Sequence, residues 1–236
     1  MLARYQLGFW AAILTSALAL LSCAGSSPSN DTRAAACVTG VGDPSAPLVD
    51  DFEDGDSELL RLGERSGSWY ASNDGTGIQA PPPDATRLKS FLSSAPGSPL
   101  SPKYALRTVG WGFLGWGAFV SANLNAPSKT LCSYDVSGLS GLQFLVKGSA
   151  NLRVTIGTQA TTPIAEGGQC RGDNCSDFGA AVAVTDDWTE VSVAFSDLTQ
   201  PSWASPAPWT PAETVRLSFW VEQGAFDFWI DDVRLY

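Results

Sequence analysis

Apolar and polar residues alternate along most of the chain after residue 47. Leu217, Phe219 and Val221 are each separated by one residue, and residues 189–195 repeat this spacing. A strand with one buried face produces such a period of two. The period predicts ten strands, at residues 48–52, 68–72, 104–109, 118–124, 142–147, 152–157, 178–184, 189–195, 215–221 and 226–236.

The segments between these strands are rich in glycine and proline. Examples are PPPD at 81–84, APGSPLSP at 95–102 and PSWASPAPWTP at 201–211, which favour turns and loops. No stretch shows a convincing helical period. About ten short strands without helices predict an all-β fold, a β-sandwich of the jelly-roll type, over residues 48–236.

The N-terminus predicts an export signal. Arg4 precedes an apolar run over residues 7–21, which is too short to span a membrane and has the length of a signal-peptide core. The run leads into LLSC at residues 20–23, which resembles a bacterial lipobox, whose cysteine becomes the acylated first residue of a lipoprotein. Cys23 is therefore the predicted lipidation site; ordinary secretion with cleavage near residues 24–25 is the alternative.

Residues 1–22 are thus expected to be a lipoprotein signal peptide, and the small, polar segment 23–47 a flexible tether. The protein is expected in a bacterial cell envelope, in contact with the membrane only through its lipid. Ala24 after the cysteine favours, by the same resemblance, the outer membrane of a Gram-negative host, with the domain facing outward.

Composition excludes several classes of function. The formal net charge of -10 and the pI of about 4.3 argue against nucleic acid and anionic membrane surfaces as partners. The chain contains no histidine. A Ser-His-Asp triad, a Cys-His pair and a histidine-liganded zinc site are therefore all excluded.

The cysteines fit an oxidising compartment. With Cys23 assigned to lipid, four of the five remain, an even set for two disulfides. Cys170 and Cys175 enclose turn-forming residues and are expected to pair, and elimination then leaves Cys37 with Cys132. A zinc site is the alternative, and its usual ligand spacing is absent. The RGD sequence inside the small loop is an adhesion tripeptide in other proteins and is interpreted here as a turn.

The last strand carries two neighbouring acids, Asp231 and Asp232, among apolar residues that are expected to be buried. A buried carboxylate without a partner costs several kcal/mol, and Arg234 is the one basic residue close to them in sequence. The apolar residues also change parity at this pair, which predicts a β-bulge there.

Six segments in order resemble the family 11 type of carbohydrate-binding module and related galactose-binding-like jelly rolls. They are LVDDFEDGD, SGSWYASNDGTG, GWGAFVSANLN, YDVSGLSGLQFLVKG, CSDFGAAVAVTDDWTEVSVAFSDLTQPSW and FDFWIDDVRLY, and together they span residues 48–236. The resemblance implies a noncatalytic jelly roll that binds a β-glucan-like polysaccharide in a groove on one sheet. It also implies structural calcium near the ends of the fold.

The resemblance places the first and last strands together, so that their acids share one Ca²⁺. The expected ligands are Asp51, Glu53 and Asp231, with Asp232 as the alternate. Calcium takes six to eight oxygen ligands and neutralises clustered carboxylates. The alternative is that the acids reach solvent at the edge of a strand.

Nine tryptophans make sugar-stacking platforms a second consequence of the sequence. Trp111, Trp116, Trp203 and Trp209 lie in loops rich in glycine or proline, whereas Trp69, Trp188, Trp220 and Trp229 lie in strands and are expected in the core. From the resemblance, Tyr70 and Trp116 are the aligned aromatic residues, and Asp177 is the polar residue of the CSDFG segment. The expected carbohydrate-binding residues are Tyr70, Trp116, Trp111 and Asp177.

These observations predict a surface-anchored, noncatalytic lipoprotein that binds a polysaccharide. The alternative is a structural or adhesive envelope lipoprotein that keeps the jelly roll without sugar affinity. A glycosidase, which needs two carboxylates at a defined separation, is disfavoured because no such pair stands out among the acids.

Overall fold

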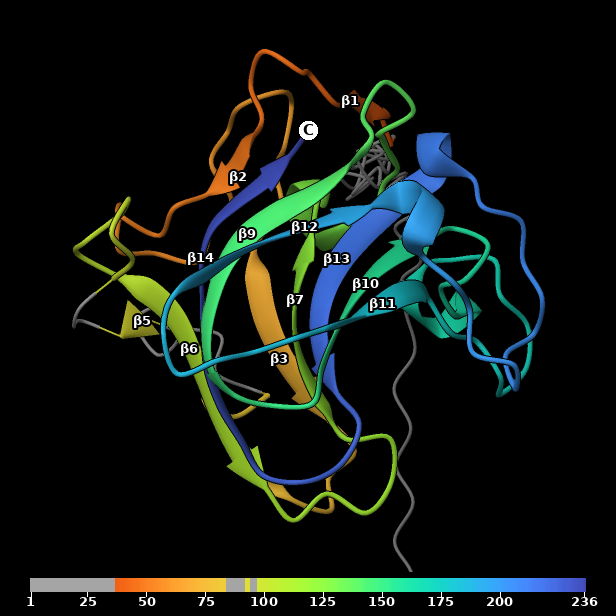
Figure 1. Ribbon diagram of the computed structural model, residues 1–236. Coiled ribbons are helices and arrows are strands. Elements are labelled where there is room, and N and C mark those ends of the chain that lie inside the picture. The colour runs from red at the N-terminus through yellow and green to blue at the C-terminus, as the bar shows by residue number, and fades with distance from the viewer. Residues whose placement is uncertain (1–36, 84–91, 94–96) are drawn as a thin grey trace, which may run out of the picture. The chain divides into compact units, whose positions relative to one another are not determined.

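The computed structural model describes residues 37–83, 92–93 and 97–236 (Figure 1). The predicted signal peptide, Cys23 and the first part of the predicted tether lie outside these residues. Besides strands, the described part contains four short 3-10 helices, at Pro127–Lys129, Ile164–Glu166, Phe195–Asp197 and Pro211–Glu213. Within these ranges no helix has the length and apolarity that crossing a membrane requires.

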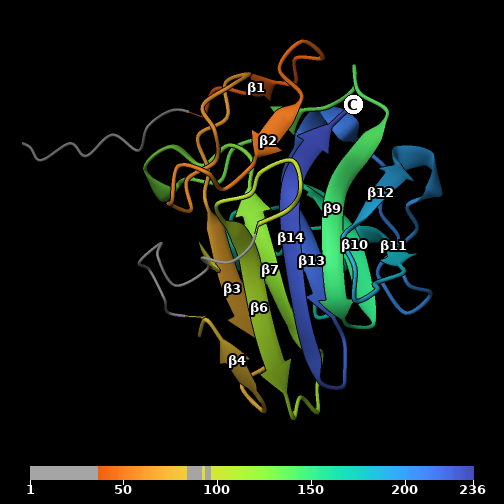
Figure 2. The ribbon, with the colours of Figure 1, turned by 60° about the vertical axis from the view of Figure 1, so that its left-hand side comes forward.

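The strands form two sheets, which lie face to face in Figures 1 and 2. Sheet 1 consists of β1 (Gly40–Val41), β3 (Trp69–Asn73), β7 (Ala118–Asn123), β8 (Tyr134–Asp135), β10 (Leu152–Thr158), β11 (Phe178–Val182) and β13 (Thr214–Val221). Sheet 2 consists of β2 (Leu48–Asp50), β4 (Ile78–Ala80), β5 (Leu92–Ser93), β6 (Ala105–Trp111), β9 (Gly141–Ser149), β12 (Thr189–Ala194) and β14 (Phe226–Leu235).

Eight of these strands, β6, β7 and β9 to β14, define the topology. Their order is β6-β14-β9-β12 in sheet 2 and β7-β13-β10-β11 in sheet 1. Along the chain these strands pass from one sheet to the other at each step except between β10 and β11, which pair in sheet 1. This is the arrangement of two Greek keys, a jelly roll. The predicted fold class, an all-β jelly-roll sandwich, is confirmed.

All ten strands predicted from the period of two are present, with ends that differ by a few residues. Four further strands, β1, β4, β5 and β8, were not predicted. Each has only two or three residues, so that no alternation of apolar and polar residues can be recognised in them.

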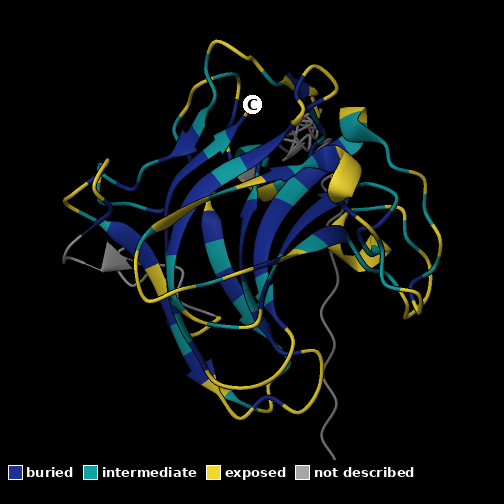
Figure 3. Cartoon of the chain, viewed as in Figure 1, coloured by how far each residue is buried: buried dark blue, intermediate teal, exposed yellow. Residues whose placement is uncertain are grey.

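The core lies between the two sheets. Phe219 on β13 and Phe144 on β9 meet edge to face, with ring centroids 4.9 Å apart. Trp69 on β3 stacks on Phe219 at 6.0 Å. Figure 3 shows that the buried residues follow the central strands, whereas the exposed ones gather in the loops. The inward residues of the strands therefore form one continuous apolar core, and the outward residues are accessible at the two outer faces of the sandwich.

The structure corrects the predicted boundary between tether and domain. From Cys37 on, the chain lies against the domain, because β1 pairs in parallel with β8 and Cys37 is bonded to Cys132. The buried guanidinium of Arg65 also donates to the carbonyl oxygens of Ala46, at 3.2 Å, and of Leu48. The last part of the predicted tether therefore belongs to the fold. Both predicted disulfides, Cys37–Cys132 and Cys170–Cys175, are confirmed.

The predicted bulge in β14 is also confirmed. The register of β14 against β9 shifts between Asp231 and Arg234, and Asp232 adopts a φ of 48°. Before the bulge Phe228 and Ile230 point into the core, and after it Val233 and Leu235 do so. One extra residue thus restores the inward parity.

Candidate functional site

The outer face of sheet 1 carries the candidate site. Along β13 the inward Leu217, Phe219 and Val221 leave Arg216, Ser218 and Trp220 pointing outward. In the register of the sheet, Ser218 lies between Thr155 on β10 and Ser121 on β7, and Trp220 lies next to Phe119. A row of small polar side chains is thus flanked by a row of large aromatic ones. This difference in size hollows the face of the sheet.

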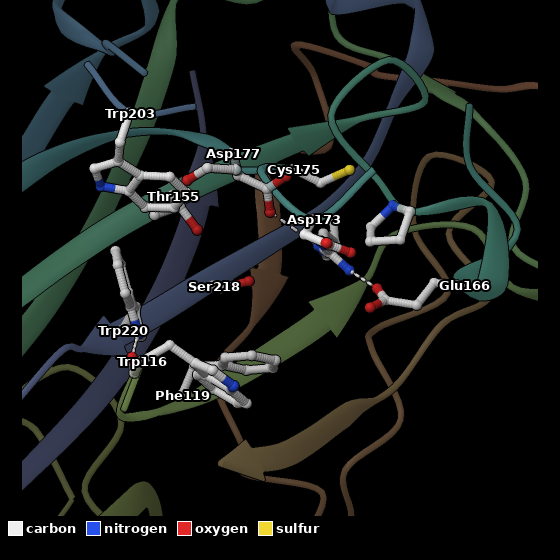
Figure 4. A pocket seen from close by; sticks show the side chains of 13 residues that line it. Trp116, Phe119, Thr155, Glu166, Asp173, Cys175, Asp177, Trp203, Ser218 and Trp220 are labelled. Atoms are coloured by element: carbon white, nitrogen blue, oxygen red, sulfur yellow. Dashed lines mark hydrogen bonds and ion pairs between the residues drawn. The ribbon is translucent and has the colours of Figure 1, made fainter. Parts of the chain in front are cut away.

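The resulting pocket has a volume of about 350 Å³. Sheet 1 forms its floor, and three loops form its walls. Its lining residues are Trp116, Phe119, Thr155, Pro163, Glu166, Asp173, Cys175, Ser176, Asp177, Trp203, Arg216, Ser218 and Trp220. Figure 4 shows four aromatic side chains on one side of the pocket and Glu166 on the other.

Two of these aromatic residues are well exposed at the rim, Trp116 (44%) and Trp203 (53%). The ring of Trp116 lies 5.5 Å from that of Phe119, and its backbone carbonyl accepts the indole N–H of Trp220 at 2.7 Å. Trp116 thus presents an exposed ring that is supported by Phe119 and Trp220.

The opposite side of the pocket is polar and contains one cation between two acids. Arg216 donates from Nε to Asp177 at 2.9 Å and from a terminal nitrogen to Glu166. Burial acts to lower the pKa of Arg216, but the charge of Asp177, its hydrogen bond and the charge of Glu166 outweigh burial and raise the pKa above its ordinary value. Asp177 also accepts from Thr161 Oγ1 at 2.7 Å. This network joins the floor of the pocket to the loop that carries Glu166.

A second hollow of about 630 Å³ continues the first across β10 and β11, and Trp220 lines both. Its polar residues include Asn151, Arg153, Glu222 and Gln223. We call the two hollows together the groove.

The four residues that the sequence predicted for sugar binding do not all meet in the groove. Trp116 and Asp177 line the first pocket. Tyr70 lies beside it on the same face, with its ring 6.1 Å from that of Phe119. Trp111 ends β6 in sheet 2, where it is exposed and shares the outward parity of Arg107. The structure thus brings three of the four together on sheet 1.

Three of the four tryptophans that were expected in the core do not lie there. Trp69 is buried as predicted. Trp220 lines the groove, and Trp229 lies on the outer face of sheet 2, between the cations of Arg107, at 4.3 Å, and Lys147, at 5.0 Å. Trp188 is half-buried and also contacts Lys147. For Trp220 a signal was present in the sequence, since it shares the parity of the polar Arg216 and Ser218.

Other groove residues were missed from the sequence. Phe119 and Arg216 occupy strand positions whose outward direction follows from the inward apolar set, but nothing in the sequence indicates which outer face is hollowed. Glu166 lies far from Arg216 in the chain, and only the folded loop brings the two together.

The acids predicted to hold calcium are placed as follows. Glu53 accepts the backbone N–H groups of Lys103 and Tyr104, at 2.8 and 2.9 Å. Asp51 accepts the N–H of Glu53 at 3.2 Å. In the part of the chain that the structure describes, no group of three or more acidic, cysteine or histidine side chains is placed to hold a metal ion.

Asp231 and Asp232 are compensated by Ser98, in the segment before β6, and by Arg234 on β14. Asp231 accepts the N–H of Ser98 at 2.8 Å, and Asp232 accepts from Ser98 Oγ and from Arg234, both at 2.9 Å. Burial raises the pKa of Asp231 to about 7. Hydrogen bonds thus take up the acid oxygens, and this arrangement by itself does not form a calcium site. The calcium stays a prediction.

Asp50, at the end of β2, is fully buried and was not among the acids predicted from the sequence to bind calcium. It accepts the indole N–H of Trp69 and the backbone N–H of Phe52, both at 2.8 Å. Burial raises its pKa to about 8, although both hydrogen bonds act to lower it. Asp50 therefore anchors Trp69 in the core.

The fold and the groove define the class of protein: a jelly-roll β-sandwich with an aromatic-rimmed groove on one outer face. No protein-family model matches the sequence, and no curated protein matches it. Among solved structures, the domain is similar to the family 11 carbohydrate-binding module of a cellulosomal cellulase of Clostridium thermocellum. The two share 15% identity and a TM-score of 0.49, over 84% of this chain and 95% of the module.

Two further solved structures show the same kind of similarity. One is a family 11 module from Clostridium thermocellum in complex with a β-1,3-1,4-mixed-linked tetrasaccharide, at 13% identity and a TM-score of 0.46, over 84% of this chain and 96% of that one. The other is a family 30 module from a cellulosomal cellulase of the same organism, at 15% identity and a TM-score of 0.45, over 71% and 90% of the two chains.

Proposed function

We propose that this chain is a noncatalytic, polysaccharide-binding lipoprotein of a bacterial cell envelope. The observation that carries the proposal is the groove on sheet 1, where Trp116, Trp203 and Trp220 surround a floor of small hydroxyl side chains. Flat aromatic rings stack on the apolar C–H faces of sugars, while hydroxyl and charged groups bind the sugar hydroxyls. The groove supplies both kinds of group side by side.

The charged groups of the pocket support binding without catalysis. Two of its three carboxylates, Asp177 and Glu166, are engaged by Arg216. Glycoside hydrolysis needs one carboxyl group that protonates the leaving oxygen and a second that attacks or activates water. Acids that both hold one guanidinium serve to fix the pocket and to accept hydrogen bonds from hydroxyl groups.

The ligand class and the location of the protein rest on the sequence. The six motifs that resemble family 11 modules favour a β-glucan-like chain. The lipobox-like LLSC at residues 20–23 favours a lipid anchor on Cys23. Together they describe a domain held at the cell surface that retains a polysaccharide there.

Binding is expected to be weak, because a groove exchanges hydrogen bonds between water and sugar for hydrogen bonds between protein and sugar at little net gain. Dissociation constants from micromolar to millimolar, about -8 to -4 kcal/mol, are expected. The test is affinity electrophoresis of the mature chain carrying Cys23→Ser, through gels with mixed-linked glucan, xyloglucan, mannan or galactan. Retardation by a glucan supports the proposal.

Matched variants locate the site. Trp116→Ala should weaken retardation. Its dissociation constant should rise about tenfold, which is about 1.4 kcal/mol, while the melting temperature should change little. Trp111→Ala removes an equally exposed tryptophan from the other sheet, and retardation should stay unchanged. If no glycan retards the wild-type protein, the alternative of a structural or adhesive envelope lipoprotein becomes the better description.

A further inference from the structure

Trp116, whose exposed ring is proposed to stack on a sugar, lies in a short glycine-rich loop. The loop joins β6 to β7 and contains Gly112, Gly115 and Gly117. Glycine-rich segments lose the most conformational entropy on folding, so an exposed ring on such a loop stays in place only if the backbone is tied down.

Asp74, in the turn between β3 and β4, supplies this tie. One oxygen of its carboxylate accepts the backbone N–H groups of both Gly115 and Gly117, at 2.8 and 2.9 Å. These are the residues immediately before and after Trp116. The N–H of Asp74 also donates to the carbonyl of Gly117 at 2.9 Å. The backbone is therefore held on both sides of the tryptophan by a single residue.

The other oxygen of Asp74 fixes its own turn. It accepts from the backbone N–H of Thr76 at 2.9 Å and from its hydroxyl at 2.6 Å. The hydroxyl oxygen of Thr76 in turn accepts the N–H of Leu114 at 2.8 Å. Hydrogen bonds to a charged acceptor are about twice as strong as neutral ones. The carboxylate thus joins two loops that lie far apart in the sequence.

The close approach explains why glycines flank Trp116. A Cβ on Gly115 would lie 3.0 Å from Asp74 Oδ2, and a Cβ on Gly117, whose φ is +93°, would lie 2.0 Å from the carbonyl of Val221. Asp74 itself does not line the pocket. From the groove side, the indole of Trp220 donates to the Trp116 carbonyl. Trp116 is therefore held between Asp74 behind it and Trp220 in front.

We infer that Asp74 is a positioning residue for ligand recognition: it touches no ligand and sets the affinity of the groove through the backbone of Trp116. This inference rests on the proposed function, because it needs a glycan that binds in the groove. It names Asp74 as a determinant of affinity that lies outside the groove.

The test is Asp74→Asn in the mature chain with Cys23→Ser. The amide keeps a single acceptor oxygen, which can accept either from Gly115 and Gly117 or from Thr76, so one of the two sets of hydrogen bonds is lost. The dissociation constant for a glucan that retards the wild type should rise about tenfold. Amide hydrogen exchange at these two glycines should become faster, while the core strands keep their protection.

Asp135→Asn is the matched control. Asp135 makes the same kind of turn, accepting from the N–H of Ser137 at 2.8 Å and from its hydroxyl at 2.6 Å, but contributes nothing to the groove lining. The affinity of the Asp135→Asn variant for the glucan should equal that of the wild type. In a Trp116→Ala background, Asp74→Asn should cause no further loss, because its effect acts through the missing ring.

The outcomes separate the two claims. If the wild type binds a glucan and Asp74→Asn binds it equally well, the inference is overturned while the proposed function stands. If the loss is the same with and without Trp116, Asp74 acts elsewhere and the inference is again overturned. If no glycan binds the wild type, both fall. Should Asp74→Asn fail to fold, Thr76→Val, which keeps the Asp74 carboxylate and removes the Thr76 hydroxyl that bonds Asp74 and Leu114, should still weaken binding several-fold.

Discussion

Trp220 donates its indole N–H to the backbone carbonyl of Trp116 across 2.7 Å, although the two residues are 104 positions apart in the chain. Trp220 belongs to the central strand of sheet 1 and Trp116 to a loop at its end. The bond therefore couples the floor of the groove to its rim.

Replacing Trp220 by phenylalanine tests this coupling. Phenylalanine keeps an aromatic ring and removes the N–H, so the variant should lose about 1 kcal/mol of stability and should bind glucan more weakly. Trp188→Phe is the control, because the Trp188 indole nitrogen is buried and has no hydrogen-bond partner among the described residues. Denaturant unfolding and affinity electrophoresis measure the two effects. Equal behaviour of the two variants would contradict the coupling.

Arg216→Met should destabilise the fold by about 3 kcal/mol, since it leaves Asp177 buried without its cation. The side chains of Arg216 and Asp177 are only 13% and 9% exposed. Arg61→Met is the matched control: Arg61 and Glu58 are 77% and 53% exposed. Loss of this surface pair should cost less than about 1 kcal/mol. Urea unfolding measures the stability of both variants. Similar losses would show that the ion pair of Arg216 and Asp177 contributes no more than a surface ion pair.

The two disulfides should differ in what they stabilise. Loop-closure entropy assigns about 4.7 kcal/mol to a bridge across roughly 100 residues and about 2 kcal/mol to one across five. Cys37→Ser with Cys132→Ser should therefore lower the melting temperature more than Cys170→Ser with Cys175→Ser. Glycan binding should show the reverse order, because Asp173 and Cys175 line the pocket. Calorimetry and affinity electrophoresis on both double variants decide the point.

Acid should loosen the loop of Trp116. Burial acts to raise the pKa of Asp74, but its hydrogen bonds with Thr76, Gly117 and Gly115 lower it to about 2. Because the folded pKa lies below the unfolded one, the contribution of Asp74 is complete above about pH 4 and is lost as the pH falls toward 2. The Gly115 and Gly117 amide shifts should titrate in this window in the wild type and stay flat in Asp74→Asn. Titration in neither protein would contradict the assignment.

Chelation distinguishes calcium from hydrogen bonding as the compensation of the terminal acids. The sequence predicts a bound ion, and at free calcium about 100 times its dissociation constant such an ion adds roughly 2.7 kcal/mol of stability. EDTA should then lower the melting temperature by several degrees. An unchanged melting temperature of protein shown to be metal-free would leave Ser98 and Arg234 as the partners that Asp231 and Asp232 have.

The strands β13 and β14 show how far the sequence alone reaches. Alternation along β13 assigns an inward and an outward face to each residue, and the parity change in β14 predicts the bulge at Asp231. Both are local properties, which a pattern of neighbours can record. Alternation also indicates that Trp220 points outward, because it shares the parity of the polar Arg216 and Ser218. Its large apolar side chain led to the opposite prediction.

The sequence does not indicate to which of the two sheets a residue belongs once the chain has turned. Trp111 and Trp116 are five residues apart and equally rich in glycine neighbours, yet the first ends β6 in sheet 2 and the second precedes β7 in sheet 1. The chain crosses from one sheet to the other in the loop between β6 and β7. The pairing of Arg216 with Glu166 is likewise set by a folded loop across 50 positions.

The bond between Cys37 and Cys132 determines where mechanical force enters the domain. A pull on the N-terminal side of Cys37 passes through the sulfur atoms to Cys132, and the 94 residues between them lie off this shortest covalent path. The short ladder between β1 and β8 is therefore spared from being peeled apart. Asp74 and Trp116 both lie inside the bypassed stretch, so the loop that carries Trp116 and the turn that ties it down lie off the covalent path of the load.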